Sequence, residues 1–102
     1  MVDTAVIVFA SFRAVPGKEG ELSELLSWMV ENTRPEPGCE LYDLYRQQGA
    51  DGAFHLFERY RNAEGLDEHR AAHYYREYRR RVADLIEGPV GVTLLEPVDV
   101  SG

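Results

Sequence analysis

The sequence predicts an α+β domain in which four strands and two helices follow one another in the order β-α-β-β-α-β. Two observations carry this prediction. Short stretches rich in β-branched and aromatic residues alternate with stretches in which apolar residues recur at the period of an α-helix. Turns rich in proline and glycine separate most of these stretches. A chain of 102 residues has room for one hydrophobic core, so we expect a single domain spanning residues 1–102.

The first part of the chain predicts one strand and one helix. Residues 5–13 (AVIVFASFR) are mostly β-branched or aromatic, and a turn at Pro16-Gly17 follows them, which indicates a strand. From residue 19 to about residue 33, apolar side chains recur three and four positions apart, and Pro35 ends the pattern. The positions that predict this amphipathic helix are Leu22, Leu25, Leu26, Met29 and Val30.

The middle of the chain predicts a hairpin followed by a second helix. Residues 39–47 and 53–61 have strand composition, and the GADG sequence of residues 49–52 lies between them, which favours an antiparallel hairpin. Asn62 is a suitable N-cap for a helix. We expect that helix to run to about Ile86, with arginines near its end, where the helix dipole favours cations.

A last strand, residues 90–95, follows Gly88-Pro89 and completes the order. This order is the split βαβ pattern of ferredoxin-like folds, which have a four-stranded antiparallel sheet. The strand at residues 5–13 is apolar on both of its alternating faces, yet two helices can cover only one face of the sheet. The other face therefore needs a partner. A second copy of the chain is the simplest one, so we expect a homodimer.

Charge and composition exclude several classes of partner. The chain carries 18 acidic and 11 basic side chains, and its net charge of −7 repels phosphate backbones, so nucleic acid is not an expected partner. No apolar run approaches the roughly 20 residues that span a bilayer, so we expect no membrane association. Cys39 is the only cysteine and Asp3 interrupts the first apolar run, so we expect no signal peptide and a cytoplasmic location.

His69 is the most informative single side chain. Leu66, His69 and Ala72 are three positions apart and would share one face of the second helix, the face that points toward the sheet. An imidazole placed there can act as a base near neutral pH. It can equally be a buried residue with a satisfied hydrogen bond, and from spacing alone this second role is the commoner one.

A metal site is not predicted. His73 follows His69 by four residues, a spacing at which two imidazoles can share a metal ion, but Arg70 stands where the zinc-protease motif has its glutamate. No third ligand stands nearby in the sequence. We therefore treat His73 as a candidate for substrate binding.

Glu58 and the tyrosines are the other candidates for substrate binding. Glu58 would share a strand face with Phe54, Leu56 and Tyr60, and it points either into a cavity or into the dimer interface. A salt bridge to an arginine is an equally good interpretation. The chain has six tyrosines, whose hydroxyls could orient an aromatic ligand. We expect Tyr45, Tyr60 and Tyr78 to do so.

Several motifs, taken in order, resemble the antibiotic biosynthesis monooxygenase domains, including quinol monooxygenases. They are Val15-Pro16-Gly17, Glu36-Pro37-Gly38-Cys39 followed by Tyr42, Phe57-Glu58-Arg59-Tyr60, and Leu66 followed by His69. The resemblance implies a dimeric α/β barrel of two ferredoxin-like domains. It also implies oxidation of an electron-rich quinol, polyphenol or anthrone by O₂ without metal or flavin, so we expect no cofactor. His69 would then be the base, or a hydrogen-bond partner of the substrate hydroxyl.

The chain departs from similar proteins at several positions, which include Ala72, Tyr74 and Tyr75 and, relative to haem-degrading proteins, Arg79 and either Ala10 or Ser11. Similar proteins often carry a second histidine where an ungapped alignment places Tyr74, so His73 is one position out of register. Haem-degrading relatives carry an axial histidine where this chain has Arg79, which argues against haem degradation. Two other functions stay open at this point. They are a non-catalytic dimeric module that binds a small ligand or responds to stress, and an isomerase or decarboxylase that uses His69.

Overall fold

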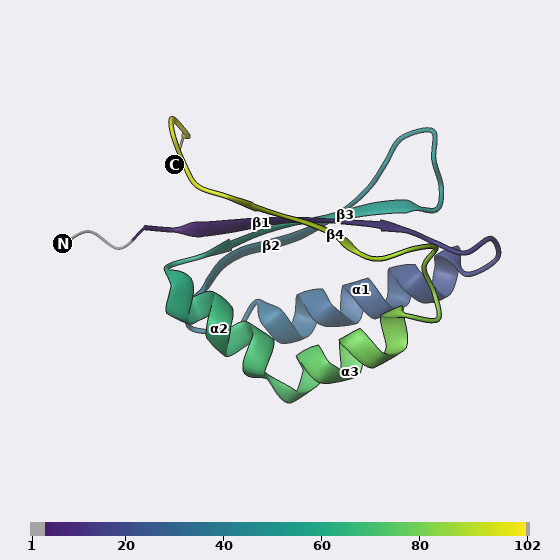
Figure 1. Cartoon of the computed structure of the whole chain (residues 1–102), viewed down its shortest axis with the longest axis horizontal. Coiled ribbons are helices and arrows are strands. Elements are labelled where there is room, and N and C mark those ends of the chain that lie inside the picture. The colour runs from purple at the N-terminus through teal and green to yellow at the C-terminus, as the bar shows by residue number, and fades with distance from the viewer. Residues whose placement is uncertain (1–3, 102) are drawn as a thin grey trace.

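The computed structural model describes residues 4–101, so Asp3 lies outside the described residues. Three helices and four strands follow one another along this part of the chain (Figure 1). They are β1 (Val6–Arg13), α1 (Glu19–Thr33), β2 (Cys39–Arg46), β3 (Ala53–Tyr60), α2 (Ala63–Ala71), α3 (His73–Val82) and β4 (Gly91–Leu95). The four predicted strands and the first predicted helix are confirmed, with boundaries that differ by no more than one residue.

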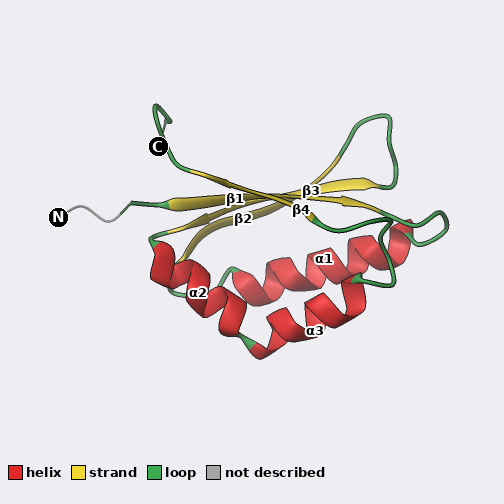
Figure 2. Ribbon diagram, in the orientation of Figure 1, coloured by secondary structure: helices red, strands yellow, loops and turns green. Residues whose placement is uncertain are grey.

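The strands form one antiparallel sheet in the order β2-β3-β1-β4. β1 pairs with β3 along its whole length, from Val6 opposite Tyr60 to Arg13 opposite Ala53. All three helices lie on one face of the sheet (Figure 2). This is the ferredoxin-like arrangement that the sequence predicts. None of the helices within residues 4–101 is long and apolar enough to cross a membrane.

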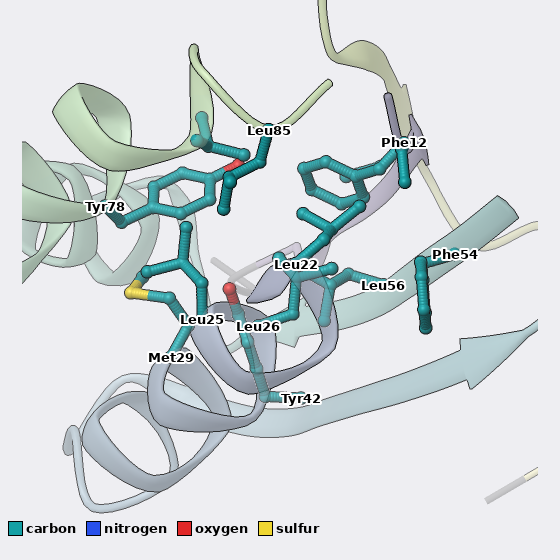
Figure 3. Close-up of a cluster of buried hydrophobic side chains, with 13 residues drawn as sticks. Phe12, Leu22, Leu25, Leu26, Met29, Tyr42, Phe54, Leu56, Tyr78 and Leu85 are labelled. Atoms are coloured by element: carbon teal, nitrogen blue, oxygen red, sulfur yellow. The ribbon is translucent and has the colours of Figure 1, made fainter. Parts of the chain in front are cut away.

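The main hydrophobic core lies between the sheet and the helices (Figure 3). The stripe of α1 that the sequence predicts is buried in this core except for the half-buried Val30, and Leu22, Leu26 and Met29 are fully inaccessible to solvent. Each such side chain stabilises the fold by roughly 1.5–3 kcal/mol through burial. From the sheet, Phe12 and Phe54 fill the same layer.

Within residues 4–101, no helix lies on the opposite face of the sheet (Figure 2), and we call it the open face. Alternation along β1 directs Val8, Ala10 and Phe12 toward the helices, where they are 3–4% exposed. Phe9 points the other way and is 37% exposed, as is Phe57 opposite it on β3. Both faces of β1 are therefore apolar, as predicted, but only one is covered within the chain.

The second predicted helix is two helices in the structure, which corrects the expectation of one helix running to about Ile86. α2 ends at Ala71 and α3 begins at His73, because Ala72 has an extended backbone (φ −67°, ψ 145°). No proline or glycine stands at this point, so the local sequence contains no stop signal. Tertiary contacts made by both helices, described below, override helix propensity here.

The last helix also ends earlier than predicted, at Val82. The residues after it pair with the end of β1 and the turn that follows. The N–H of Val15 donates to the carbonyl of Leu85 at 2.9 Å, and the N–H of Glu87 donates to the carbonyl of Arg13 at 2.8 Å. A longer helix would need some of these backbone groups for its own hydrogen bonds, so the pairing with β1 limits its length.

Candidate functional site

His69 lies at the centre of a cluster between α2 and the sheet. It shares the buried face of α2 with Leu66, as predicted, and is only 2% exposed. Its ring centroid is 5.1–5.6 Å from the centroids of three tyrosine rings, those of Tyr42, Tyr60 and Tyr75. The Asn62 side chain caps the start of this helix by accepting from the N–H of Gly65 at 3.0 Å, which fixes the segment that carries the imidazole.

Glu36 determines the protonation pattern of the His69 ring. Nδ1 of His69 lies 2.9 Å from Oε2 of Glu36, in the turn that follows α1. The hydroxyl of Tyr74, on α3, donates to the same oxygen. Because a carboxylate only accepts hydrogen bonds, the network assigns the proton of the neutral ring to Nδ1. Nε2 then carries the lone pair, which makes it the basic end of the ring.

The electrostatic surroundings keep this imidazole neutral at pH 7. Burial lowers the pKa of His69 below its ordinary value of 6.5, and Arg70 lowers it further. The hydrogen bond and the charge of Glu36 act in the opposite direction and raise it. His69 is therefore a neutral ring at physiological pH that can accept a proton, as a general base must.

Glu58 is a second titratable group in the same layer. It points toward the helices, is 5% exposed, and accepts a hydrogen bond of 2.6 Å from the hydroxyl of Tyr60. Burial raises its pKa from 4.5 to about 7, with the negative charge of Glu36 adding to this effect. The hydrogen bond from Tyr60 and the charge of Arg70 oppose it. Glu58 thus exchanges its proton near neutral pH, where an acid or base is most useful.

Comparison with known proteins identifies the family. Residues 5–81 match the family model described as antibiotic biosynthesis monooxygenase. The chain belongs to this family. The identification confirms the resemblance that the sequence motifs indicate, and it covers the segments that carry Glu36, Glu58 and His69.

One relative and two solved structures are similar over almost the whole chain. A Mycobacterium tuberculosis protein named "Putative monooxygenase Rv0793" is 46% identical over 95 residues, or 92% of each chain. The structure of Rv0793 aligns with a TM-score of 0.92 and 42% identity, covering 97% of this chain and 100% of that one. A crystal structure titled antibiotic biosynthesis monooxygenase aligns with a TM-score of 0.86 and 26% identity, covering 92% and 99% of the two chains.

Within this monooxygenase fold, the structure brings together three of the residues singled out from the sequence. His69, Glu58 and Tyr60 lie in one cluster, because the Tyr60 ring contacts the imidazole and its hydroxyl contacts the carboxyl. Glu58 therefore faces the helix layer and not the open face, and its hydrogen-bond partner is a tyrosine. Among the described residues it forms no salt bridge to an arginine.

Tyr78 lies next to this cluster. It is 6% exposed and packs on Tyr75, with 5.5 Å between ring centroids, so one ring separates it from His69. Its other side helps to line a cavity of about 400 Å³ between the end of α3 and β4. Val82, Ile86 and Val92 line the same cavity, so its walls are largely apolar.

Tyr45 and His73 lie apart from His69. Tyr45 stands on β2 opposite His55, on the open face, and is 55% exposed. His73 is the first residue of α3, is exposed, and packs edge-on against the ring of Tyr74. Within residues 4–101 no group of three histidine, cysteine, aspartate or glutamate side chains is placed to hold a metal ion.

Sequence reasoning missed the partners of His69. In the sequence, Glu36 stands out only as part of a family motif, and Tyr74 only as one of six tyrosines, at the position where similar proteins carry a second histidine. The contact between Glu36 and His69 joins residues 33 positions apart, so no helical or strand periodicity could indicate it. The Glu36-Pro37-Gly38 motif was the one available signal.

Proposed function

We propose that this protein is a cofactor-independent monooxygenase that oxidises a small electron-rich aromatic molecule, such as a quinol, polyphenol or anthrone, with O₂. The observation that carries the proposal is the buried, neutral His69, whose Nδ1 is held by Glu36 so that Nε2 is the basic nitrogen. Three tyrosine rings lie around the imidazole and suit an aromatic substrate. Membership of the monooxygenase family supports the reaction type.

The chemistry requires a base more than it requires a cofactor. In the proposed reaction Nε2 of His69 accepts the proton of a substrate hydroxyl, and the resulting anion is electron-rich enough to reduce O₂. One oxygen atom enters the substrate and the other leaves as water. A quinol that becomes a hydroxyquinone, or an anthrone methylene that becomes a carbonyl, supplies all four electrons, so no external reductant is needed. The protein contributes the base, orientation and exclusion of water.

Glu58 suits the second half of this reaction. After O₂ adds to a ring carbon, the hydroperoxide must break its O–O bond, and the departing hydroxide needs a proton. A carboxyl with a pKa of about 7 holds such a proton in a large fraction of molecules at neutral pH. We infer that His69 first returns the hydroxyl proton to the peroxide anion, which forms the hydroperoxide and frees Nε2 to remove the proton from carbon. Glu58 donates its proton to the departing hydroxide, and the proton taken from carbon later restores the carboxyl through solvent. The substrate then leaves as the carbonyl product with one molecule of water.

We also propose that the working form is a homodimer in which the two open faces pack together. Phe9, Phe57 and Tyr45 expose 37–55% of their surface on this face, an apolar patch that a folded chain normally covers. An isologous contact places the same patch on both partners. A cytoplasmic location suits the single free Cys39, which has no disulfide partner in the chain.

The direct test is oxygen consumption by the purified protein. We expect one or more members of a panel of quinols, polyphenols and anthrones to consume O₂ in a one-to-one ratio with substrate, faster than spontaneous oxidation in the same buffer. Incorporation of one atom of ¹⁸O₂ into the product identifies a monooxygenase. Substrate conversion without O₂ uptake would indicate an isomerase or decarboxylase instead. Tight binding without any conversion would indicate a ligand-binding module.

A further inference from the structure

We propose that Glu36 is a positioning residue for His69, and that a backbone contact between Gly38 and Gly65 sets the distance between the two side chains. The inference rests on the proposed function in one respect, the role of His69 as the base. It adds a second part to the site: a turn far away in sequence that orients the imidazole without touching the substrate.

The first observation concerns the hydrogen bonds of the Glu36 carboxylate. Oε2 of Glu36 accepts from Nδ1 of His69 at 2.9 Å and also from the hydroxyl of Tyr74. Oε1 is buried and has no hydrogen-bond partner among the described residues. A mostly buried carboxyl group is costly unless its hydrogen bonds compensate. The hydrogen bonds that His69 and Tyr74 donate to Oε2 offset this cost. The carboxylate of Glu36 is therefore positioned by these two side chains, and it positions them in turn.

The second observation is the break at Ala72. On a continuous α-helix, residues five positions apart point about 140° away from each other, because each residue turns the helix by about 100°. His69 and Tyr74 are five positions apart, yet both reach the same carboxylate oxygen. The extended backbone of Ala72 (ψ 145°) changes the direction of the chain between α2 and α3, and this allows the two side chains to converge on Glu36.

The third observation is that two glycines allow the turn to lie directly on α2. A Cβ atom on Gly38 would stand 2.7 Å from Cα of Gly65, and one on Gly65 would stand 3.0 Å from the carbonyl oxygen of Gly38. Backbone atoms cannot give way as a flexible side chain can. Gly65 precedes His69 by four residues, which is about one helical turn on the same face. The contact therefore lies one turn from the imidazole that Glu36 holds.

These contacts have one chemical consequence. The carboxylate favours the ring form with the proton on Nδ1, and its charge increases the proton affinity of Nε2 in a buried place where desolvation decreases it. Loss of the carboxylate, or separation of the turn from α2, should leave His69 in a mixture of ring forms. The fraction with a basic Nε2 would then fall.

The experiment compares Glu36→Gln and Gly65→Ala with a matched control, Gly20→Ala. Gly20 lies in α1, is exposed, and a Cβ there would meet no atom within 4 Å, so the control adds the same methyl group without moving the turn. NMR of the imidazole nitrogens reports the ring form and the titration midpoint of His69 in the free protein. The chain has three histidines, and the signal absent from His69→Gln identifies the one of interest.

In the wild type and in Gly20→Ala we expect the proton on Nδ1. In Glu36→Gln and Gly65→Ala we expect a larger fraction with the proton on Nε2, and in Glu36→Gln a lower titration midpoint. Turnover of an active substrate should fall about 10- to 100-fold in Glu36→Gln, a part of the roughly 10²–10⁴-fold that a positioned base contributes. The acid limb of its pH profile for kcat/KM should move to lower pH.

The inference is overturned if wild-type His69 carries its proton on Nε2, or if Glu36→Gln changes neither the ring form nor the titration midpoint. Both readouts come from the free protein, so they hold or fail independently of turnover. An inactive wild type with the expected NMR results would contradict the proposed function and not the positioning role. If Glu36→Gln does not fold, Gly65→Ala tests the same contact with every titratable group retained.

Discussion

The two faces of the sheet place a histidine in opposite situations. On the helix-covered face, His69 has one nitrogen bonded to a carboxylate, and Nε2 has no hydrogen-bond partner among the described residues. On the open face, both nitrogens of His55 have neutral partners: Nδ1 lies 2.9 Å from the hydroxyl of Ser11, and Nε2 lies 2.9 Å from Oε1 of Gln47. His55 also stacks on Phe9 at 5.4 Å. His69 therefore has a ring nitrogen that is free to react, whereas the ring of His55 links neighbouring strands.

The difference arises because the helices cover one face of the sheet and not the other. The covered face brings in groups from α2, α3 and the turn after α1, so polar groups 33 residues apart in sequence can meet in a buried place. Within residues 4–101 no helix lies on the open face (Figure 2). Its polar contacts join neighbouring strands, as between Ser11 and His55, or reach the segment after α1, where Arg34 bonds to Asp43 at the edge of the sheet. The candidate catalytic groups therefore lie where the covered face of the sheet, which carries Glu58, meets the helix layer, and the open face is the surface that we propose for association.

The largest expected effect is on turnover, and it distinguishes His69 from His55. His69→Ala should reduce turnover by about 10²-fold or more, because it removes the proposed base. His55→Ala should leave turnover per folded dimer within about a factor of two, since its contacts lie on the other side of the sheet. Steady-state rates at pH 7.5, with circular dichroism to verify folding, provide the measurement. Equal losses in both variants would contradict the distinction.

A charge on the open face should disrupt association without unfolding the chain. Phe57→Asp places a carboxylate at the centre of the proposed interface, where desolvating it is costly. We expect sedimentation velocity to report a dimer for the wild type and a monomer for this variant at micromolar concentration. Val98→Asp is the control, because Val98 is 94% exposed and lies beyond β4. A monomeric wild type would refute the role assigned to the open face.

The same contrast explains what could be predicted from the sequence. The strands, α1 and the cap at Asn62 depend on local patterns, and they appear where periodicity and turn residues indicate them. The alternation of β3 placed Glu58 and Tyr60 on one face, but it could not say which face. The break at Ala72 and the contact of Glu36 with His69 depend on long-range packing. No helical or strand periodicity encodes either feature, and the motif that contains Glu36 does not indicate its partner.

Glu58 on the covered face should make stability depend on pH. Its pKa is raised from 4.5 to about 7 in the folded state, so between these values the folded chain holds more protons than the unfolded chain. Stability contributed by this group is therefore complete below pH 4.5 and decreases as pH rises through 7, by up to about 3 kcal/mol. Glu58→Gln cannot ionise and should avoid this loss.

The measurement is denaturant unfolding of both proteins at pH 5 and pH 8. The free energy of unfolding of Glu58→Gln, relative to wild type, should be greater at pH 8 than at pH 5. His69, whose pKa is lowered, has the opposite effect, because its stability contribution is lost as pH falls below 6.5. That contribution occurs in both proteins and cancels in the comparison. A difference that does not change with pH would show that Glu58 ionises normally in the folded state.

The smallest expected effect is that of metal removal, and it concerns the histidines of the helix layer. His69 and His73 are spaced as a metal-binding pair on a continuous helix, but the break at Ala72 separates them, and Nδ1 of His69 is already bonded to Glu36. We expect turnover to change by less than about a factor of two after treatment with a strong chelator and buffer exchange. If activity is instead lost, and a single divalent metal restores it, the reaction depends on that metal.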